Sequence, residues 1–191
     1  MIRQTTMNNF SFILTGIFII QMLGCSSPRK TTHTAGLEPY EIKSTVILKN
    51  KVAARSIDVK QVKPEELVNF AKTLLGTPYR YGSVKKEYGF DCSGFVNYVF
   101  NHFQIKVPRT TVEFTNVGKE ISIKESKEGD LILFTGSNAK TGMVGHMGII
   151  TKNKKNEFTF IHAASGAGGG VIISEMNAYF IPRFVKVIRV F

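Results

Sequence analysis

The chain has 191 residues, with 25 Lys and Arg against 14 Asp and Glu, so its formal net charge is +11. This length allows one domain with a sizeable core and is too short for two ordinary domains. A basic surface suits nucleic acid, anionic lipid or an acidic polymer, and charge alone does not distinguish these partners. The cellular compartment of the protein is therefore needed to choose among these partners.

The first 24 residues have the pattern of an export signal. Arg3 is the only charged residue before Cys25 and gives the segment a positive amino-terminal region, and the stretch from Phe10 to Leu23 is mostly apolar. This stretch is short for a membrane span, which needs about 20 apolar residues. An uncleaved membrane anchor is the alternative interpretation, and the polar residues Ser11 and Gln21 argue against it. Because export separates the chain from nucleic acid, we expect no nucleic-acid partner.

The run Met22-Leu23-Gly24-Cys25 resembles a bacterial lipoprotein box. The resemblance implies that residues 1–24 are a lipoprotein signal peptide and that Cys25 is lipidated and becomes the new amino terminus. We therefore expect an exported protein, lipid-anchored in the bacterial cell envelope at the outer membrane and facing the periplasm. Residues 25–61 are rich in Ser, Thr, Lys and Arg and are expected to form a tether. The folded domain is expected over residues 62–191.

Helical patterns come first in this domain, and strand patterns follow. A helix is expected from Pro64 to Leu75, and a second from Cys92 to Phe103 with Asp91 as its N-cap. Short strand-like runs separated by turn residues occur at residues 131–134, 147–150, 158–161, 171–173 and 185–190. This order predicts an α+β domain in which helices pack on an antiparallel sheet of about five or six strands.

Cys92 is a candidate nucleophile. If Cys25 carries a lipid, Cys92 is a single free thiol, whereas exported proteins normally pair their cysteines. Its place in the first turn of the expected second helix favours the thiolate over the thiol, which predicts a lowered pKa. A small buried structural residue is the alternative interpretation.

His146 and His162 lie in two strand-like runs that are joined by a polar turn. In a hairpin symmetric about Lys154 they would be cross-strand neighbours, and a two-residue slip would leave them diagonal. If the helix of Cys92 covers their face of the sheet, the three residues form a nucleophile, a base within hydrogen-bond reach and an orienting group.

The main alternative is that these three residues bind a zinc ion instead of forming a catalytic group. Catalytic zinc sites usually contain close ligand pairs, and these residues are far apart in the sequence. We therefore expect no metal and no cofactor. The remaining histidines, His33 and His102, are interpreted as structural, and the glycine run from Gly166 to Gly170 as a hairpin loop.

A series of motifs in this part of the chain resembles that of the NlpC-type cell-wall cysteine peptidases. The motifs are Gly76-Thr77-Pro78-Tyr79-Arg80-Tyr81-Gly82, Gly89-Phe90-Asp91-Cys92-Ser93-Gly94-Phe95-Val96, Val107-Pro108-Arg109-Thr110-Thr111, Glu128-Gly129-Asp130-Leu131, Gly145-His146-Met147-Gly148-Ile149 and Phe160-Ile161-His162-Ala163-Ala164-Ser165. The resemblance extends from about Glu65 to Phe191. It implies a circularly rearranged papain-like fold and hydrolysis of the bond between D-γ-glutamate and diaminopimelate, or a related dibasic residue, in peptidoglycan stem peptides.

The resemblance also implies catalytic roles by motif position. Cys92 is the nucleophile, His146 the base and His162 the orienting residue. Tyr79 matches the tyrosine that lies beside the nucleophile and helps to hold the acyl intermediate, with Tyr81 as the alternative for this role.

Asp91, Ser93 and Arg109 match positions that recognise polar groups of the stem peptide. Relatives often have a glutamine a few residues after the arginine, where this chain has Glu113. The expected partners are peptidoglycan stem peptides and, through the lipid, a membrane, and the protein is expected to be a monomer. A wall-binding lipoprotein without turnover, and a thiol amidase or acyltransferase on the same fold, are the alternative functions.

Overall fold

The structure is a computed structural model that describes residues 54–155, 157–166 and 169–191. The expected signal peptide, Cys25, His33 and most of the expected tether lie outside the described residues. No helix in the described part of the chain is long and apolar enough to cross a membrane.

The first helix, α1, spans Pro64–Lys72 and begins where the sequence predicted it. Pro64 occupies the first turn, where a missing N–H breaks no helical hydrogen bond, and Glu65 and Glu66 lie at the positive end of the helix dipole. The helix ends before the expected Leu75, because the next residues form a tighter turn with hydrogen bonds to the carbonyl three residues back. Gly76 follows with a positive φ of 81°, as suits a glycine.

The second helix, α2, spans Cys92–His102, as expected. Asp91 is its N-cap, and its carboxylate accepts the N–H of Gly94. A Cβ at Gly94 would lie 2.0 Å from the carbonyl oxygen of Ser83, so the preceding loop packs directly on the first turn. The helix buries the residues Cys92, Ser93, Gly94, Phe95, Val96, Val99 and Phe100.

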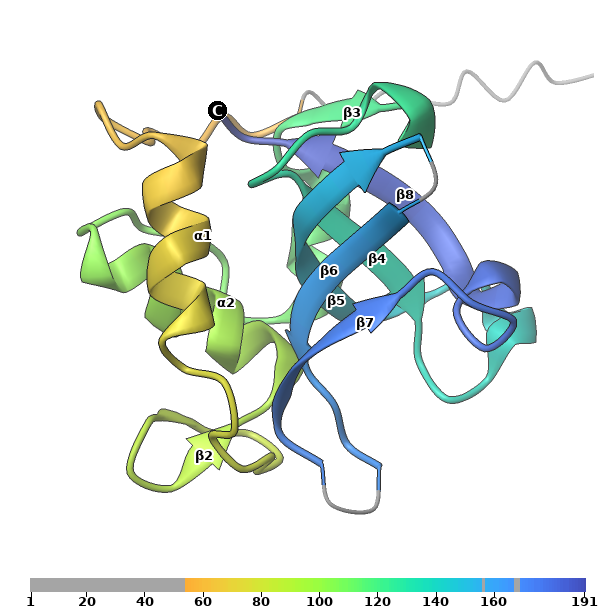
Figure 1. The fold of residues 1–191 in the computed structure, drawn as a ribbon, viewed down its shortest axis with the longest axis horizontal. Helices are drawn as coiled ribbons and strands as arrows, with labels where there is room; N and C mark the ends of the chain where they lie inside the picture. The colour runs from red at the N-terminus through yellow and green to blue at the C-terminus, as the bar shows by residue number, and fades with distance from the viewer. Residues whose placement is uncertain (1–53, 156, 167–168) are drawn as a thin grey trace, which may run out of the picture. The chain divides into compact units, whose positions relative to one another are not determined.

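Within the described residues, six strands form one antiparallel sheet in the order β3-β8-β4-β5-β6-β7 (Figure 1). The strands are β3 (Lys119–Ile121), β4 (Leu131–Thr135), β5 (Val144–Lys154), β6 (Glu157–Ala163), β7 (Val171–Glu175) and β8 (Phe184–Arg189). The five expected runs all form strands, so the predicted α+β class is confirmed. The short strand β3 was not predicted, because it is polar and largely exposed.

Several smaller elements join these parts. A two-stranded hairpin of β1 (Val84–Lys85) and β2 (Gly89–Phe90) precedes α2. Short 3-10 helices are η1 (Thr111–Asn116), η2 (Ile123–Glu125), η3 (Ala139–Thr141) and η4 (Ile181–Arg183).

Each face of the sheet carries an apolar cluster, and β4 contributes to both. Leu131 and Leu133 belong to the main core beneath α1 and α2, whereas Ile132 and Phe134 belong to a smaller core on the other face. Figure 1 shows both helices on one side of the sheet. Burial on both faces explains why β4 is an unbroken apolar run instead of an alternating one.

The folded domain begins before the boundary that the sequence predicted at residue 62. Arg55 forms a parallel bridge with Val117, and its N–H donates to the carbonyl of Asn116 at 2.8 Å. Ile57 and Val59 pack against the main core. The sequence placed the boundary too far along the chain, because these two apolar residues alternate with polar ones in a stretch whose composition is that of a tether. The domain therefore includes the chain from Arg55 onward.

Candidate active site

Cys92 occupies the first position of α2 and lies against β5. Its Sγ is 3.4 Å from the hydroxyl oxygen of Thr111 and donates to the carbonyl oxygen of Gly145 at 3.9 Å. The backbone N–H of Met147 also lies within hydrogen-bond reach of the sulfur. Gly145 and Met147 are the chain neighbours of His146, so the thiol contacts the strand on both sides of the predicted base.

Burial raises the pKa of the Cys92 thiol above its ordinary value, because only 8% of the residue is exposed. The hydrogen bond from Thr111 and the backbone N–H groups of Ser93 and Met147 lower the pKa, and the Asp91 carboxylate raises it further. The lowered pKa predicted from the helix dipole is wrong for the free protein, since burial outweighs the helix terminus. At neutral pH the resting sulfur is therefore a thiol.

His146 and His162 are brought together as the sequence predicted, with His146 Nε2 2.8 Å from His162 Nδ1. Their strands pair with Lys154 opposite Glu157, and a bulge follows Ile150, so the hairpin is not symmetric about Lys154. The two histidines are therefore diagonal neighbours, which is the arrangement predicted for a two-residue slip.

The ring of His162 is held from two further sides. Its Nε2 lies 2.9 Å from the hydroxyl of Ser174 on β7, and the residue is 2% exposed. On β5, Gly148 leaves room for it: a Cβ at Gly148 would lie 3.1 Å from His162 Cβ and 2.8 Å from the carbonyl oxygen of Ile161. These contacts fix the orientation of His162 and, through it, that of His146.

Both imidazoles are neutral at pH 7. Burial lowers the pKa of His146 to about 4, and burial together with the neighbouring His146 lowers the pKa of His162 to about 3. If His162 donates its Nε2 proton to Ser174, its Nδ1 accepts from His146 Nε2. In that arrangement His146 keeps an unprotonated Nδ1, which is the nitrogen that a general base needs.

Among the described residues, neither imidazole forms a hydrogen bond with Cys92 Sγ. The predicted direct bond between nucleophile and base is therefore absent from the resting structure. The imidazoles lie on the face of the smaller core, with the Phe134 ring 6.1 Å from His146 and the Phe160 ring 5.0 Å from His162, measured between ring centroids. The helix α2 covers the opposite face, so the predicted condition that the helix of Cys92 covers the face of the two histidines is not met, and the thiol instead contacts the backbone of β5 beside His146. Catalytic hydrogen bonds are often long in free enzymes and tighten when substrate binds.

Asp91, Ser93 and Arg109 form one polar network beside Cys92. Arg109 donates from Nη2 to Asp91 Oδ2 at 2.8 Å, and from Nη1 to Ser93 Oγ at 3.0 Å. Ser93 in turn donates to Asp91 Oδ1 at 3.1 Å. The Arg109 side chain is 41% exposed and that of Asp91 11%. The structure therefore brings the three predicted recognition residues together, with the guanidinium as their most accessible group.

The two candidate tyrosines differ in their surroundings. Tyr79 packs against the main core, and its N–H donates to the carbonyl of Gly169 in the glycine run at 3.1 Å. Burial raises the pKa of Tyr79, and the nearby Cys92 and Asp91 raise it further. Tyr81 is 89% exposed. The structure therefore places the hydroxyl of Tyr79 near the thiol and keeps it protonated.

Thr111 and Ser174 are site residues to which the sequence reasoning assigned no role. Thr111 is the first residue of η1, and its place at the end of the Val107–Thr111 motif was the available signal. Glu113 shapes this turn by accepting the N–H and the hydroxyl of Thr110 at 2.9 and 2.7 Å. Ser174 gave no signal, because only strand pairing brings β7 beside His162.

The residues interpreted as structural behave accordingly where they are described. The His102 ring stacks on Phe70 with centroids 3.6 Å apart. The glycine run connects β6 and β7, which pair as a hairpin. Over residues 54–155, 157–166 and 169–191, no group of three or more His, Cys, Asp or Glu residues is placed to hold a metal ion.

An α+β domain in which a helix-terminal thiol lies against a strand whose imidazole is hydrogen-bonded to a second imidazole on the next strand is the arrangement of a papain-like cysteine peptidase. The chain belongs to the NlpC/P60 family, whose model matches residues 76–189.

Similar proteins agree with this assignment. A probable endopeptidase of Haemophilus influenzae is 40% identical over 117 residues, which are 60% of this chain and 67% of that protein. The murein DD-endopeptidase MepS/murein LD-carboxypeptidase of Escherichia coli K12 is 36% identical over 139 residues, 71% of this chain and 65% of that protein. The crystal structure of an NlpC/P60 family protein from Bacillus cereus has a TM-score of 0.60 and 26% identity, over 69% of this chain and 41% of that chain. This chain therefore spans less than two thirds of the latter two proteins.

Proposed function

We propose that the protein is a peptidoglycan endopeptidase that cuts the bond between D-γ-glutamate and diaminopimelate, or a related dibasic residue, in stem peptides. The observation that carries the proposal is the position of Cys92, whose sulfur contacts β5 on both sides of His146 while His146 is bonded to His162. The names of the relatives as endopeptidases support the same reaction class.

In the proposed first step, the proton of the Cys92 thiol moves to Nδ1 of His146, and the sulfur attacks the γ-glutamyl carbonyl carbon. His146 then holds a proton on each nitrogen, and His162 accepts the hydrogen bond from its Nε2–H. Because the resting thiol and imidazole are both neutral, this transfer accompanies the attack on bound substrate and does not precede it. The Tyr79 hydroxyl remains protonated and donates to the developing oxyanion.

In the following steps, protonated His146 gives its Nδ1 proton to the leaving amine, and the carbon–nitrogen bond breaks to leave a thioester on Cys92. Water then attacks the thioester carbon while His146 accepts a proton from it. The carbon–sulfur bond breaks, His146 returns the proton to the sulfur of Cys92, and the acyl product is released as a carboxylic acid. Asp91, Ser93 and Arg109 hold polar groups of the amino-terminal part of the stem peptide, where Arg109 offers an exposed positive charge.

The proposal is tested by incubating the full chain with defined stem peptides and identifying the products by mass spectrometry. Release of L-alanyl-D-glutamate from diaminopimelate is the expected result. A cut between two D-centres would favour the second candidate, the DD-endopeptidase activity for which the Escherichia coli relative is named. Tight binding without any product would point to a wall-binding protein, and transfer to an added amine to an acyltransferase.

We also propose that Cys25 is lipidated and that the protein is anchored in the outer membrane facing the periplasm. The support is the lipoprotein box at residues 22–25 and the apolar stretch before it. Mass spectrometry of the expressed protein should show Cys25 at the amino terminus with an added acyl mass. Cys25 without added mass, or an amino-terminal peptide that still contains residues 1–24, would contradict lipidation.

A further inference from the structure

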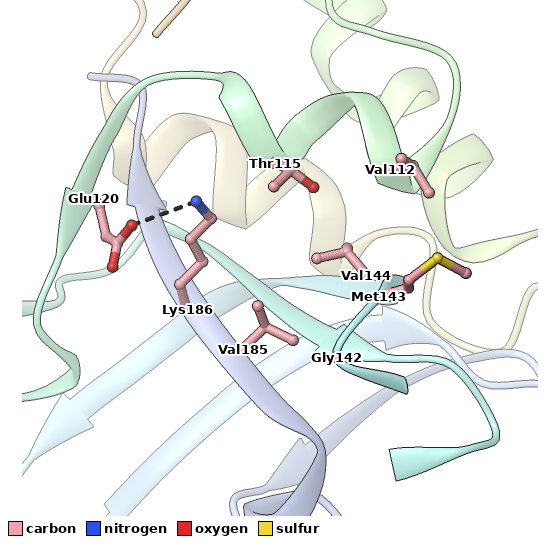
Figure 2. A pocket seen from close by; sticks show the side chains of 8 residues that line it. All are labelled: Val112, Thr115, Glu120, Gly142, Met143, Val144, Val185 and Lys186. Atoms are coloured by element: carbon pink, nitrogen blue, oxygen red, sulfur yellow. Dashed lines mark hydrogen bonds and ion pairs between the residues drawn. The ribbon is translucent and has the colours of Figure 1, made fainter. Parts of the chain in front are cut away.

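A pocket of about 420 Å³ lies between η1, the turn before β5, and β8 (Figure 2). This volume is within the usual range of roughly 300–1,000 Å³ for small-molecule sites. Its lining residues are Val112, Thr115, Glu120, Gly142, Met143, Val144, Val185 and Lys186. None of these residues belongs to the catalytic or recognition groups described above.

Two residues that line the pocket are sequence neighbours of the residues that contact the thiol. Val112 directly follows Thr111, whose hydroxyl oxygen is 3.4 Å from Cys92 Sγ, and Val144 directly precedes Gly145, whose carbonyl accepts from the thiol at 3.9 Å. Two walls of the pocket therefore continue from the two groups that contact the sulfur.

The ends of the pocket differ in chemistry. Figure 2 shows Val112 and Met143 at one side and Glu120 with Lys186 at the other. Val112 and Met143 are 59% and 69% exposed, so they present apolar surface to a ligand. Lys186 Nζ lies 3.3 Å from Glu120 Oε2, and the two side chains are 19% and 69% exposed. The apolar end is next to the thiol, and the ion pair is farther from it.

The direction of the bound peptide follows from the order of contacts along one segment. Arg109 bonds to Asp91 and Ser93, Thr111 then contacts the thiol, and Val112 enters the pocket. If the acyl part of the substrate occupies the Arg109 network, the leaving part extends past the thiol toward the pocket.

We infer that this pocket binds the dibasic residue on the leaving side of the scissile bond and selects diaminopimelate over lysine; the inference rests on the proposed function. Diaminopimelate has an aliphatic chain that ends in a carbon bearing both an ammonium and a carboxylate group. The aliphatic chain of diaminopimelate packs against the valine side chains that line the pocket. Its distal carboxylate pairs with Lys186, and its distal ammonium group pairs with Glu120. Lysine has the same chain and ammonium group but no distal carboxylate.

The test compares kcat/KM for L-alanyl-γ-D-glutamyl-diaminopimelate and for the same peptide with L-lysine, using the full chain. Lys186→Met keeps the aliphatic stem and removes the charge, and Lys119→Met is the matched control because Lys119 is exposed on β3 and outside the pocket. In Lys186→Met, kcat/KM for the diaminopimelate peptide should fall about tenfold, as for loss of one charge-assisted hydrogen bond, with the lysine peptide and the control unchanged. Glu120→Gln should lower kcat/KM for both peptides, because both carry the ammonium group.

Equal effects of Lys186→Met on both peptides, or no effect on either, would overturn the inference while leaving the proposed hydrolysis intact. If Lys186→Met does not fold, Glu120→Gln tests whether the pocket binds the residue, because Glu120 is exposed and its loss should reduce cleavage of both peptides only if it binds their ammonium group. Selection is then decided by the unaltered protein, in which equal kcat/KM for the two peptides would overturn it. Failure of the unaltered protein to cleave either peptide would contradict the proposed function itself, and the inference with it.

Discussion

Individual side chains set the reactivity of the thiol. Burial favours the neutral thiol, and the Thr111 hydroxyl is the first of the groups that oppose this effect. A sequence pattern showed Cys92 at a helix start and hence the dipole, but it did not show how completely the helix would be covered. The sequence could therefore predict that Cys92 is the candidate nucleophile, but it could not predict whether the pKa of its thiol is raised or lowered.

Replacement of Thr111 by Val should raise the pKa of Cys92 further, because the thiolate loses a hydrogen-bond donor. At a fixed pH near 8 a smaller fraction of the sulfur is then ionised, so alkylation by iodoacetamide should be slower and its pH midpoint higher. Thr111→Ser keeps the hydroxyl and should react at the parental rate. Identical pH profiles for the Val and Ser variants would show that the contact does not tune the thiol.

Pairing of β5, β6 and β7 determines the geometry of the imidazoles. The alternation and the turn between residues 152 and 157 were enough to predict the hairpin and the proximity of His146 and His162. The bulge after Ile150 could not be predicted, because it leaves no residue pattern and adds only one unpaired residue. Ser174 was missed for a related reason, since its register depends on a third strand.

A methyl group at Gly148 tests this arrangement. In Gly148→Ala the added carbon would meet the Ile161 carbonyl oxygen at 2.8 Å and the Cβ of His162 at 3.1 Å, so the strands must separate or His162 must turn. The expected result is a fall in kcat of roughly a hundredfold, because a base displaced by about 1 Å loses its alignment. Gly166→Ala is the matched control, since no atom lies within 4 Å of a Cβ there and the residue does not have a positive φ.

The neutral imidazole pair also makes stability depend on pH. Both folded pKa values are depressed, to about 4 and about 3, relative to an unfolded value of about 6.5. The unfolded chain therefore binds protons first as pH falls, and stability present above pH 6.5 is lost through the window down to the folded values. Between pH 7 and pH 5 the free energy of unfolding should decrease by about 4 kcal/mol, measured by urea denaturation and far-UV circular dichroism. A flat profile over this range would contradict burial of the pair.

The end of the chain is fastened to the rest of the domain by an ion pair. Arg189 on β8 donates to both carboxylate oxygens of Asp130, from Nε at 2.8 Å and from Nη2 at 2.6 Å, and Asp130 is 2% exposed. Arg189 also donates to the carbonyl of Glu125 at 3.1 Å. The sequence predicts the strand that contains Arg189 and the strand that follows Asp130, but not the order of the sheet that places β8 beside β4. Sheet order arises from packing of the whole core, which no local pattern specifies.

Removal of this arginine should weaken the whole domain. Arg189→Met leaves a buried carboxylate without its partner and should lower the free energy of unfolding by about 3 kcal/mol. Lys152→Met removes a lysine whose ion pair with Glu157 is exposed, with side-chain accessibilities of 39% and 47%, and should cost less than about 1 kcal/mol. Equal losses in the two variants, in denaturation curves at pH 7, would contradict the structural role of the Asp130 pair.

The most direct test of the central claim is the rate of stem-peptide hydrolysis by the parent protein and by two variants that each lack one cysteine. Cys92→Ala should lower kcat at least a thousandfold while its circular dichroism spectrum stays unchanged, because no other group replaces the attacking sulfur. Cys25→Ser, which removes the only other cysteine in the chain, should hydrolyse the soluble peptide at the parental rate. A Cys92→Ala protein that cleaves the peptide as fast as the parent would show that the reaction does not pass through this thiol.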